Sequence, residues 1–281
     1  MRKRKLDIVV ISDVHLGTYG CYADELLVYL SSIEPKILVL NGDIIDIWHF
    51  SASYFPPSHL KVIKKIISMA SKGTEVHYIK GNHDEVPKRI VNFAMGNIKF
   101  GESLVLNLDG KRTWFFHGDI FDTTLLNPRW VSKIGNLGFR LLDYANKLTN
   151  WVLKKRGKEK FSLSSRIKAA KGGRKHISRF KDIATDIAFS HNYDTVICGH
   201  IHQPEKTFVE RHAGNVLYLN SGDWVENLSA LEYSLKRWKI YRYANDKLVP
   251  FFMDTELKEM DMNTLIKTIT SKKEKTIKAA H

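Results

Sequence analysis

Short clusters of Asp, His and Asn recur along the chain, and each directly follows a segment with the composition of a β-strand. They are Asp13-Val14-His15, Gly42-Asp43-Ile44-Ile45-Asp46, Gly81-Asn82-His83-Asp84, His117-Gly118-Asp119 and Gly199-His200-Ile201-His202. In open α/β sheets, ligands gather beyond the carboxyl ends of the strands. The sequence therefore predicts an α/β fold that brings side chains from distant parts of the chain to one edge of its sheets.

Hydrophobic periodicity places the expected elements. Strands are predicted at 6–12, 37–40, 75–79, 194–198 and 216–219, and helices at 23–33, where Pro35 follows, and at 59–70. Residues 104–108 and 112–116, joined by Asp109-Gly110, predict one hairpin, and residues 231–243 predict another. Strands that alternate with helices favour a sheet that is largely parallel at its start.

The central part of the chain lacks this alternation. From about residue 121 to 190, Gly, Lys, Arg, Leu and Trp replace strand-forming residues, which predicts a helical insertion beside the clusters. We expect one domain over 1–255 that contains this insertion, followed by a basic tail at 256–281.

Composition bears on the cellular compartment of the protein and on the kind of partner that it binds. The 281 residues carry a net charge of +14, so we expect an anionic partner: a phosphorylated substrate, nucleic acid or an acidic membrane surface. Only Cys21 and Cys198 occur, which is typical of a reducing cytosol. We find neither an apolar run of about 20 residues nor a secretory signal, and we expect a cytoplasmic location.

The clusters offer carboxylate, amide and imidazole donors. Asp13 and His15 are two residues apart, so on an extended segment they face the same way, and His200 and His202 repeat this spacing. Taken singly, Gly42-Asp43 is compatible with a turn and His117 with a core histidine. Taken together, the clusters predict two divalent metals that activate a water and clamp a phosphate. We assign Asp13, His15 and His202 to one metal, Asn82, His117 and His200 to the other, and Asp43 as the bridge.

The donor set also bears on the metal and on acid catalysis. Mixed oxygen and nitrogen donors without Cys favour Mn²⁺, with Fe and Zn²⁺ as alternatives. His83 is expected to act as a general acid for the leaving oxygen, with Asp84 holding its ring. Asp46 is expected to stabilise its loop rather than to bind metal.

The motifs D-x-H, G-D-x-x-D, G-N-H-D, H-G-D and G-H-x-H together resemble the calcineurin-like metallophosphoesterase superfamily over about residues 6–245. The resemblance implies a four-layer α/β/β/α sandwich and in-line attack on phosphorus by water activated by the two metals. The ligand assignment above agrees with that family position by position.

Within this superfamily, the chain most resembles the UDP-2,3-diacylglucosamine hydrolases of lipid A synthesis. Those enzymes place a helical cap over the acyl chains where this chain has its insertion, and Asn220-Ser221-Gly222-Asp223-Trp224 resembles their Gly-Asp-Trp turn. The insertion is basic at 154–179 and carries the apolar residues Trp130, Phe139, Leu141, Leu142, Trp151 and Leu153. The resemblance implies attack on the α-phosphorus, which releases UMP and a lipid 1-phosphate. This chain departs from the best-studied members at His83, where they carry Arg.

The insertion also predicts how a lipid-linked nucleotide is held. Basic side chains beside a site steer anionic substrates, and amphipathic helices with Trp and Leu lie at membrane interfaces. We therefore expect peripheral contact with the inner membrane, and substrate contacts from Lys168, Lys171, Arg174 and Lys175.

Other functions compete with this one. A soluble phosphodiesterase or phosphatase acting on a nucleotide or phosphoprotein needs no apolar cap. A nuclease would spread basic and aromatic residues along an open groove, whereas here they gather in one insertion, so we expect no nucleic acid. A scaffold without activity, such as the retromer subunit of this fold, would have lost catalytic groups that this chain keeps.

Overall fold

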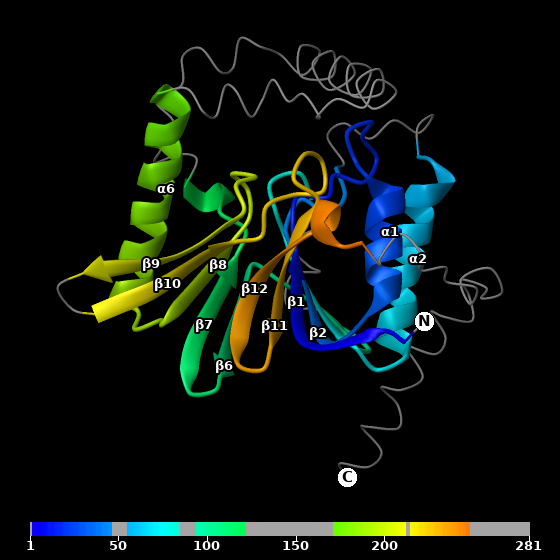
Figure 1. Cartoon of the computed structure of the whole chain (residues 1–281), viewed down its shortest axis with the longest axis horizontal. Coiled ribbons are helices and arrows are strands. Elements are labelled where there is room, and N and C mark those ends of the chain that lie inside the picture. Colours follow the sequence, from blue (N-terminus) through cyan, green and yellow to red (C-terminus); the bar gives the residue numbers. More distant parts are fainter. Residues whose placement is uncertain (1, 47–54, 85–93, 122–170, 212–213, 248–281) are drawn as a thin grey trace.

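The computed structural model describes residues 2–46, 55–84, 94–121, 171–211 and 214–247. Two β-sheets lie face to face, with helices on their outer sides (Figure 1). The helices are α1 (Ala23–Ser32), α2 (Pro57–Ser71) and α6 (Lys171–Ser190), with the short helices η2 (Asp119–Phe121) and η4 (Tyr243–Asn245). This arrangement is the predicted four-layer α/β/β/α sandwich.

The first sheet has the strand order β12-β11-β1-β2-β3-β5-β4. Its strands are β1 (Arg4–Ile11), β2 (Ile33–Asn41), β3 (Glu75–Ile79), β4 (Ala94–Met95), β5 (Ile98–Gly101), β11 (Ser229–Ser234) and β12 (Arg237–Arg242). Strands β1, β2, β3 and β5 are parallel neighbours, and the predicted C-terminal hairpin, β11 and β12, pairs antiparallel beside β1.

The second sheet has the strand order β6-β7-β8-β10-β9. Its strands are β6 (Ser103–Leu108), β7 (Lys111–Phe116), β8 (Thr195–Cys198), β9 (Glu205–Arg211) and β10 (Gly214–Asn220). Strands β6 and β7 form the predicted hairpin, and β7, β8 and β10 are parallel neighbours. The carboxyl ends of β7 and β8 therefore lie at one edge of this sheet.

Burial on both sides explains why the second half of β1, Ile8 to Ile11, is apolar without a break. Val9 and Ile11 pack in the core under α1 and α2, whereas Ile8 and Val10 pack in the core between the two sheets. A third core lies between α6 and the second sheet. Strands covered on both faces are rich in consecutive apolar residues, and this pattern allowed them to be predicted from the sequence.

Three strands were not predicted, namely β4, β5 and β9. Strand β9 lies at the edge of the second sheet, where it pairs only with β10. Its charged ends, Glu205-Lys206 and Glu210-Arg211, are typical of an edge strand and conceal the apolar alternation on which the prediction relied.

The predicted helix at 23–33 was one residue too long, because Ile33 already belongs to β2. Strand β2 also continues through Pro35, which the sequence placed at the helix end. Pro35 pairs in register with Leu6 of β1 and precedes the segment that pairs with β3, which starts at Ile37. Its missing N–H therefore interrupts no bond to β3.

The predicted insertion is described only in part. Residues 122–170 and the predicted tail at 256–281 lie outside the described residues. The last twenty residues of the predicted range form α6, which buries Phe180, Ala184 and Ala188 against the second sheet. In the part of the chain that the structure describes, no helix is both long and apolar enough to cross a membrane.

Candidate metal centre

All five clusters follow the carboxyl end of a strand: β1, β2, β3, β7 and β8. Backbone bonds join their loops. The amide of Asp13 donates to the carbonyl of Gly42 at 3.0 Å, and the amide of Gly199 donates to that of His117 at 2.9 Å. The structure thus brings the clusters together, as the sequence predicted.

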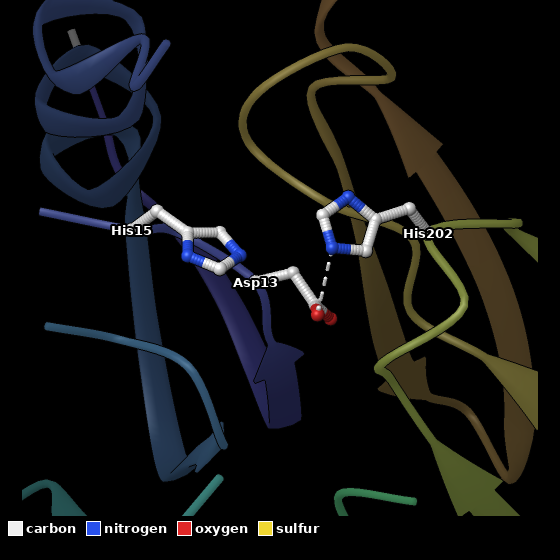
Figure 2. Close-up of side chains that lie close together, drawn as sticks. All are labelled: Asp13, His15 and His202. Carbon is white, nitrogen blue, oxygen red and sulfur yellow. Dashed lines mark ion pairs between the residues drawn. The ribbon is translucent and has the colours of Figure 1, made fainter. Parts of the chain in front are cut away.

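The first group consists of Asp13, His15 and His202, whose candidate ligand atoms all lie within 4.8 Å of one another. The fully buried Asp13 carboxylate lies between the two imidazole rings (Figure 2). Its Oδ1 is 3.1 Å from Nε2 of His202. The backbone amide of His200 donates to both carboxylate oxygens, at 3.1 and 3.0 Å, and fixes their orientation. This group is the one that the sequence assigned to the first metal.

The second group consists of Asp43, His117 and His200, again with candidate ligand atoms within 4.8 Å of one another. Nδ1 of the buried His117 donates to the carbonyl of Asn41 at 2.9 Å. Since the carbonyl can only accept, Nδ1 carries a proton, and loss of the proton on Nε2 would make the lone pair there available to a metal. The exposed Asn82 lies in the adjacent loop, next to His83, whose backbone amide donates to Oδ1 of Asp43 at 2.8 Å.

Asp43 lies between the two groups. Its Oδ2 is 3.3 Å from Nε2 of His117 and 4.0 Å from Nε2 of His15. One carboxylate oxygen therefore faces a member of each group, which is the placement a bridging ligand requires.

The backbone at these positions is strained. Asp13, His15, Asp43, His200 and His202 all have φ between +51° and +66°. Residues other than glycine rarely adopt the left-handed conformation, and such strain clusters at functional sites, where the surrounding structure enforces it. Its presence at five candidate ligands is an independent sign of a site.

Two motif glycines leave room for ligand side chains. Gly42 has φ of +84°, and a Cβ atom there would overlap the ring of His117. A Cβ on Gly81 would overlap the carboxylate of Asp43. The glycines of G-D-x-x-D and G-N-H-D are thus explained by close packing around the candidate ligands.

The structure corrects the predicted role of Asp84. Its carboxylate accepts hydrogen bonds from the amides of Ile44, Ile45 and Gly81 and from the hydroxyl of Tyr78. These four bonds turn it toward the loops and away from His83, so the prediction that Asp84 holds the His83 ring was wrong.

Asp46 takes that place. Its buried Oδ2 is 3.0 Å from Nδ1 of His83 and 3.1 Å from Nδ1 of His15. One carboxylate thus orients both a candidate ligand and the candidate acid. From the sequence we expected Asp46 only to stabilise its loop, and the spacing G-D-x-x-D was the available signal of a further role.

The charges in the site are strongly coupled. Burial by itself would lower the pKa of His117, but the carboxylate of Asp43 raises it to about 10. Burial likewise opposes the charged form of His15, yet its hydrogen bond to Asp46 raises the pKa to about 9. Burial favours the neutral form of Asp43, whereas His117 lowers its pKa to about 2. Anionic oxygens therefore alternate with imidazoles that hold protons, which a divalent cation can displace.

This coupling predicts a pH-dependent affinity for Mn²⁺. Below pH 9, His15 and His117 are protonated in protein stripped of metal, and each must lose its proton to bind a cation. As the pH rises, we expect the apparent Kd for Mn²⁺ to fall by about tenfold per pH unit for each proton that the cation displaces. Titration calorimetry between pH 6 and pH 8, in buffers of different ionisation enthalpy, measures both the affinity and the released protons. An affinity independent of pH, with no proton release, would show that these imidazoles do not bind the metal.

The structure describes three of the four residues that were predicted to contact the substrate. Lys168 lies outside the described residues, whereas Lys171, Arg174 and the exposed Lys175 lie in the first turns of α6. Helix α6 begins at the end of the molecule that carries the site loops and runs toward the start of β8 at the opposite end (Figure 1). Its first turns therefore lie at the same end as the site. Their contacts with a substrate stay a prediction.

Residues 6–204 match the family described as Calcineurin-like phosphoesterase. The chain belongs to this family. A relative from Blochmanniella pennsylvanica, described as UDP-2,3-diacylglucosamine hydrolase, is 25% identical over 82% of this chain and 93% of its own length. One with the same description from Aliivibrio fischeri is 24% identical over 84% of this chain and 98% of its own. The solved phosphoesterase Yfce from E. coli aligns with 84% of this chain and 92% of its own at 16% identity and a TM-score of 0.41, too low to add to the assignment.

Membership in this calcineurin-like family, together with hydrolase relatives that match nearly end to end, makes the protein a metal-dependent hydrolase. The donors present fit that chemistry, because carboxylate oxygens and imidazole nitrogens suit Mn²⁺, Fe and Zn²⁺.

Proposed function

We propose that this protein hydrolyses the pyrophosphate of a UDP-diacylglucosamine-type lipid and releases UMP and a lipid 1-phosphate. The observation that carries the reaction class is the meeting of two candidate ligand groups at Asp43. Asp13, His15 and His202 would hold one divalent cation, and Asn82, His117 and His200 the other, with Asp43 between them. Mn²⁺ is the proposed metal.

When bound, two such cations activate water and neutralise charge on a phosphoryl group. The chain supplies the rest. Asp46 holds Nδ1 of His83 at 3.0 Å, so Nε2 is left to give a proton or a positive charge to the leaving oxygen. The His83 side chain is 27% exposed, which places it within reach of a substrate. Asp84 stabilises the loop that follows β2 by accepting hydrogen bonds from the backbone amides of Ile44 and Ile45.

Two observations support the lipid substrate. The relatives described as UDP-2,3-diacylglucosamine hydrolases match over more than nine tenths of their length. Residues 122–170, whose sequence is basic and contains Trp and Leu, follow Phe121 in the chain, and Phe121 is four positions after His117. A segment of this composition suits a substrate with two acyl chains and a diphosphate, and we propose a peripheral position on the cytoplasmic face of the inner membrane.

The alternative is a phosphodiesterase or phosphatase that acts on a water-soluble phosphoester. The observation that favours it is His83 itself, because a proton donor suits a leaving alkoxide more than a leaving phosphate, which is already a weak base.

The test compares two substrates in the presence of Mn²⁺: UDP-2,3-diacylglucosamine in mixed micelles and bis-p-nitrophenyl phosphate. We expect EDTA-sensitive release of UMP from the lipid, with a kcat/KM far above that for the diester, and no release by the Asp43→Ala variant. Cleavage of the diester alone would keep the metal site and reject the lipid substrate. UMP release that EDTA does not affect would reject the metal mechanism.

A further inference from the structure

Asp223 lies in the loop that follows β10, and its side chain is fully buried although it belongs to none of the three groups of side chains that could hold a metal. Its Oδ1 accepts hydrogen bonds from the backbone amides of Val225, Glu226 and Asn227, those of Val225 and Asn227 at 2.9 and 3.1 Å. Three donors on one oxygen fix the orientation of the carboxylate, so Oδ2 points in a defined direction.

Oδ2 of Asp223 faces His202. It accepts a hydrogen bond from Nδ2 of Asn227 at 2.5 Å and lies 3.8 Å from Nδ1 of His202. Asn227 Nδ2 also donates to the backbone carbonyl of His202 at 3.0 Å. The same short loop therefore contacts His202 at both its ring and its backbone, which is held at a φ of +52°.

The loop also reaches the neighbouring ligand. The backbone amide of Trp224 donates to the carbonyl of Asp13 at 3.1 Å. On the opposite side of the His202 ring, Nε2 is 3.1 Å from Oδ1 of Asp13. The His202 ring thus lies between two carboxylates, with Asp13 facing Nε2 and Asp223 facing Nδ1.

We propose that Asp223 is a positioning residue for the first cation, and that it acts through His202 with Asn227 as its support. A carboxylate beside Nδ1 favours the tautomer that carries its proton there, which leaves the Nε2 lone pair for the cation. The proposal rests on the proposed assignment of His202 to a metal. It gives a role to the Gly-Asp-Trp segment beyond that of a turn.

The variant Asp223→Asn tests this role. It keeps the size of the side chain and an oxygen for the three amides, but it places an NH₂ group toward Nδ1 of His202 and favours the wrong tautomer. Outer carboxylate partners of metal-bound His contribute about 10- to 100-fold to metal affinity. We expect calorimetry and Mn²⁺ electron paramagnetic resonance to show one of the two Kd values raised by that factor and the other nearly unchanged.

The control is Asp194→Asn. The Asp194 carboxylate accepts a hydrogen bond from the backbone amide of Arg112 at 2.7 Å. Asp194 directly precedes β8, whereas His202 lies beyond the other end of that strand. This substitution should leave both Kd values unchanged. If Asp223→Asn does not fold, Asn227→Ala removes the support alone and should weaken the same Kd by a smaller factor.

The outcomes separate the two proposals. If wild-type protein binds two Mn²⁺ and Asp223→Asn changes neither Kd, or weakens both equally, the positioning role is overturned and the metal site stands. If wild-type protein binds no Mn²⁺, the proposed function itself fails. A shift of His202 from the Nδ1–H to the Nε2–H tautomer in ¹⁵N nuclear magnetic resonance spectra of Asp223→Asn would support the role directly, and an unchanged tautomer would contradict it.

Discussion

Replacing Asp43 with alanine should lower kcat/KM by about 10³-fold or more, equivalent to about 4 kcal/mol of transition-state stabilisation. The reason is its placement: Oδ2 faces His117 at 3.3 Å and His15 at 4.0 Å, and Oδ1 accepts the amide of His83 at 2.8 Å. Loss of this carboxylate would remove the ligand that we propose the two cations share, and it would remove the acceptor of the His83 amide in the loop that carries Asn82. We expect no more than one tightly bound Mn²⁺ per chain, measured by inductively coupled plasma mass spectrometry alongside steady-state kinetics.

A matched control is Asp7→Ala on β1, where an exposed ion pair with Lys36 is lost far from the site. It should keep both cations and full activity, because exposed ion pairs contribute little to stability. Retained turnover in Asp43→Ala, with two cations still bound, would rule out a bridging role for this residue.

Replacing His83 with alanine should lower kcat by about 10²- to 10⁴-fold, the usual contribution of a general acid. Its Nδ1 lies 3.0 Å from Oδ2 of Asp46. A ring nitrogen of His83 also lies within 4.8 Å of candidate ligand atoms of His15 and Asp43, but our proposal assigns His83 to neither cation. We therefore expect His83→Ala to bind two Mn²⁺ with Kd values close to those of the wild type. The loss should be larger for a phenyl than for a p-nitrophenyl phosphodiester, because phenolate is the poorer leaving group.

His191→Ala serves as the control, since this exposed histidine lies at the far end of α6, next to Tyr193, and should not affect kcat. Asp46→Asn should reproduce part of the His83 defect, because Asp46 holds that ring. If His83→Ala lost one cation, His83 would be a ligand. If the variant lost the same factor in kcat on the phenyl and the p-nitrophenyl phosphodiester, His83 would act through its charge rather than by proton transfer.

Much of the fold could be predicted because its strands are covered on both faces. The apolar runs in β1 and β2, the strand-like segment of β3 and the clusters that follow all three predicted the parallel core together with the site. Strand β9 was not predicted because its charged ends conceal the apolar alternation, and β5 because only two of its four residues, Ile98 and Phe100, carry apolar side chains.

The candidate ligands could be found from spacing, whereas the side chains that orient them could not. Asp84 is adjacent to His83 in sequence, yet its carboxylate turns back toward the backbone of the β2 loop. Asp46, 37 positions earlier, reaches the His83 ring instead. Asp223 reaches His202 from a loop that only the folded arrangement of β8 and β10 brings alongside. Such partners are decided by three-dimensional contacts and not by adjacency in the sequence.

The most direct test of the dinuclear centre is anomalous X-ray diffraction from crystals grown with Mn²⁺. The arrangement of the two ligand groups predicts two peaks per chain, with the Asp43 carboxylate between them. One should be ligated by Asp13, His15 and His202, and the other by Asn82, His117 and His200. A single peak, or a pair of peaks that Asp43 does not join, would contradict the two-metal account.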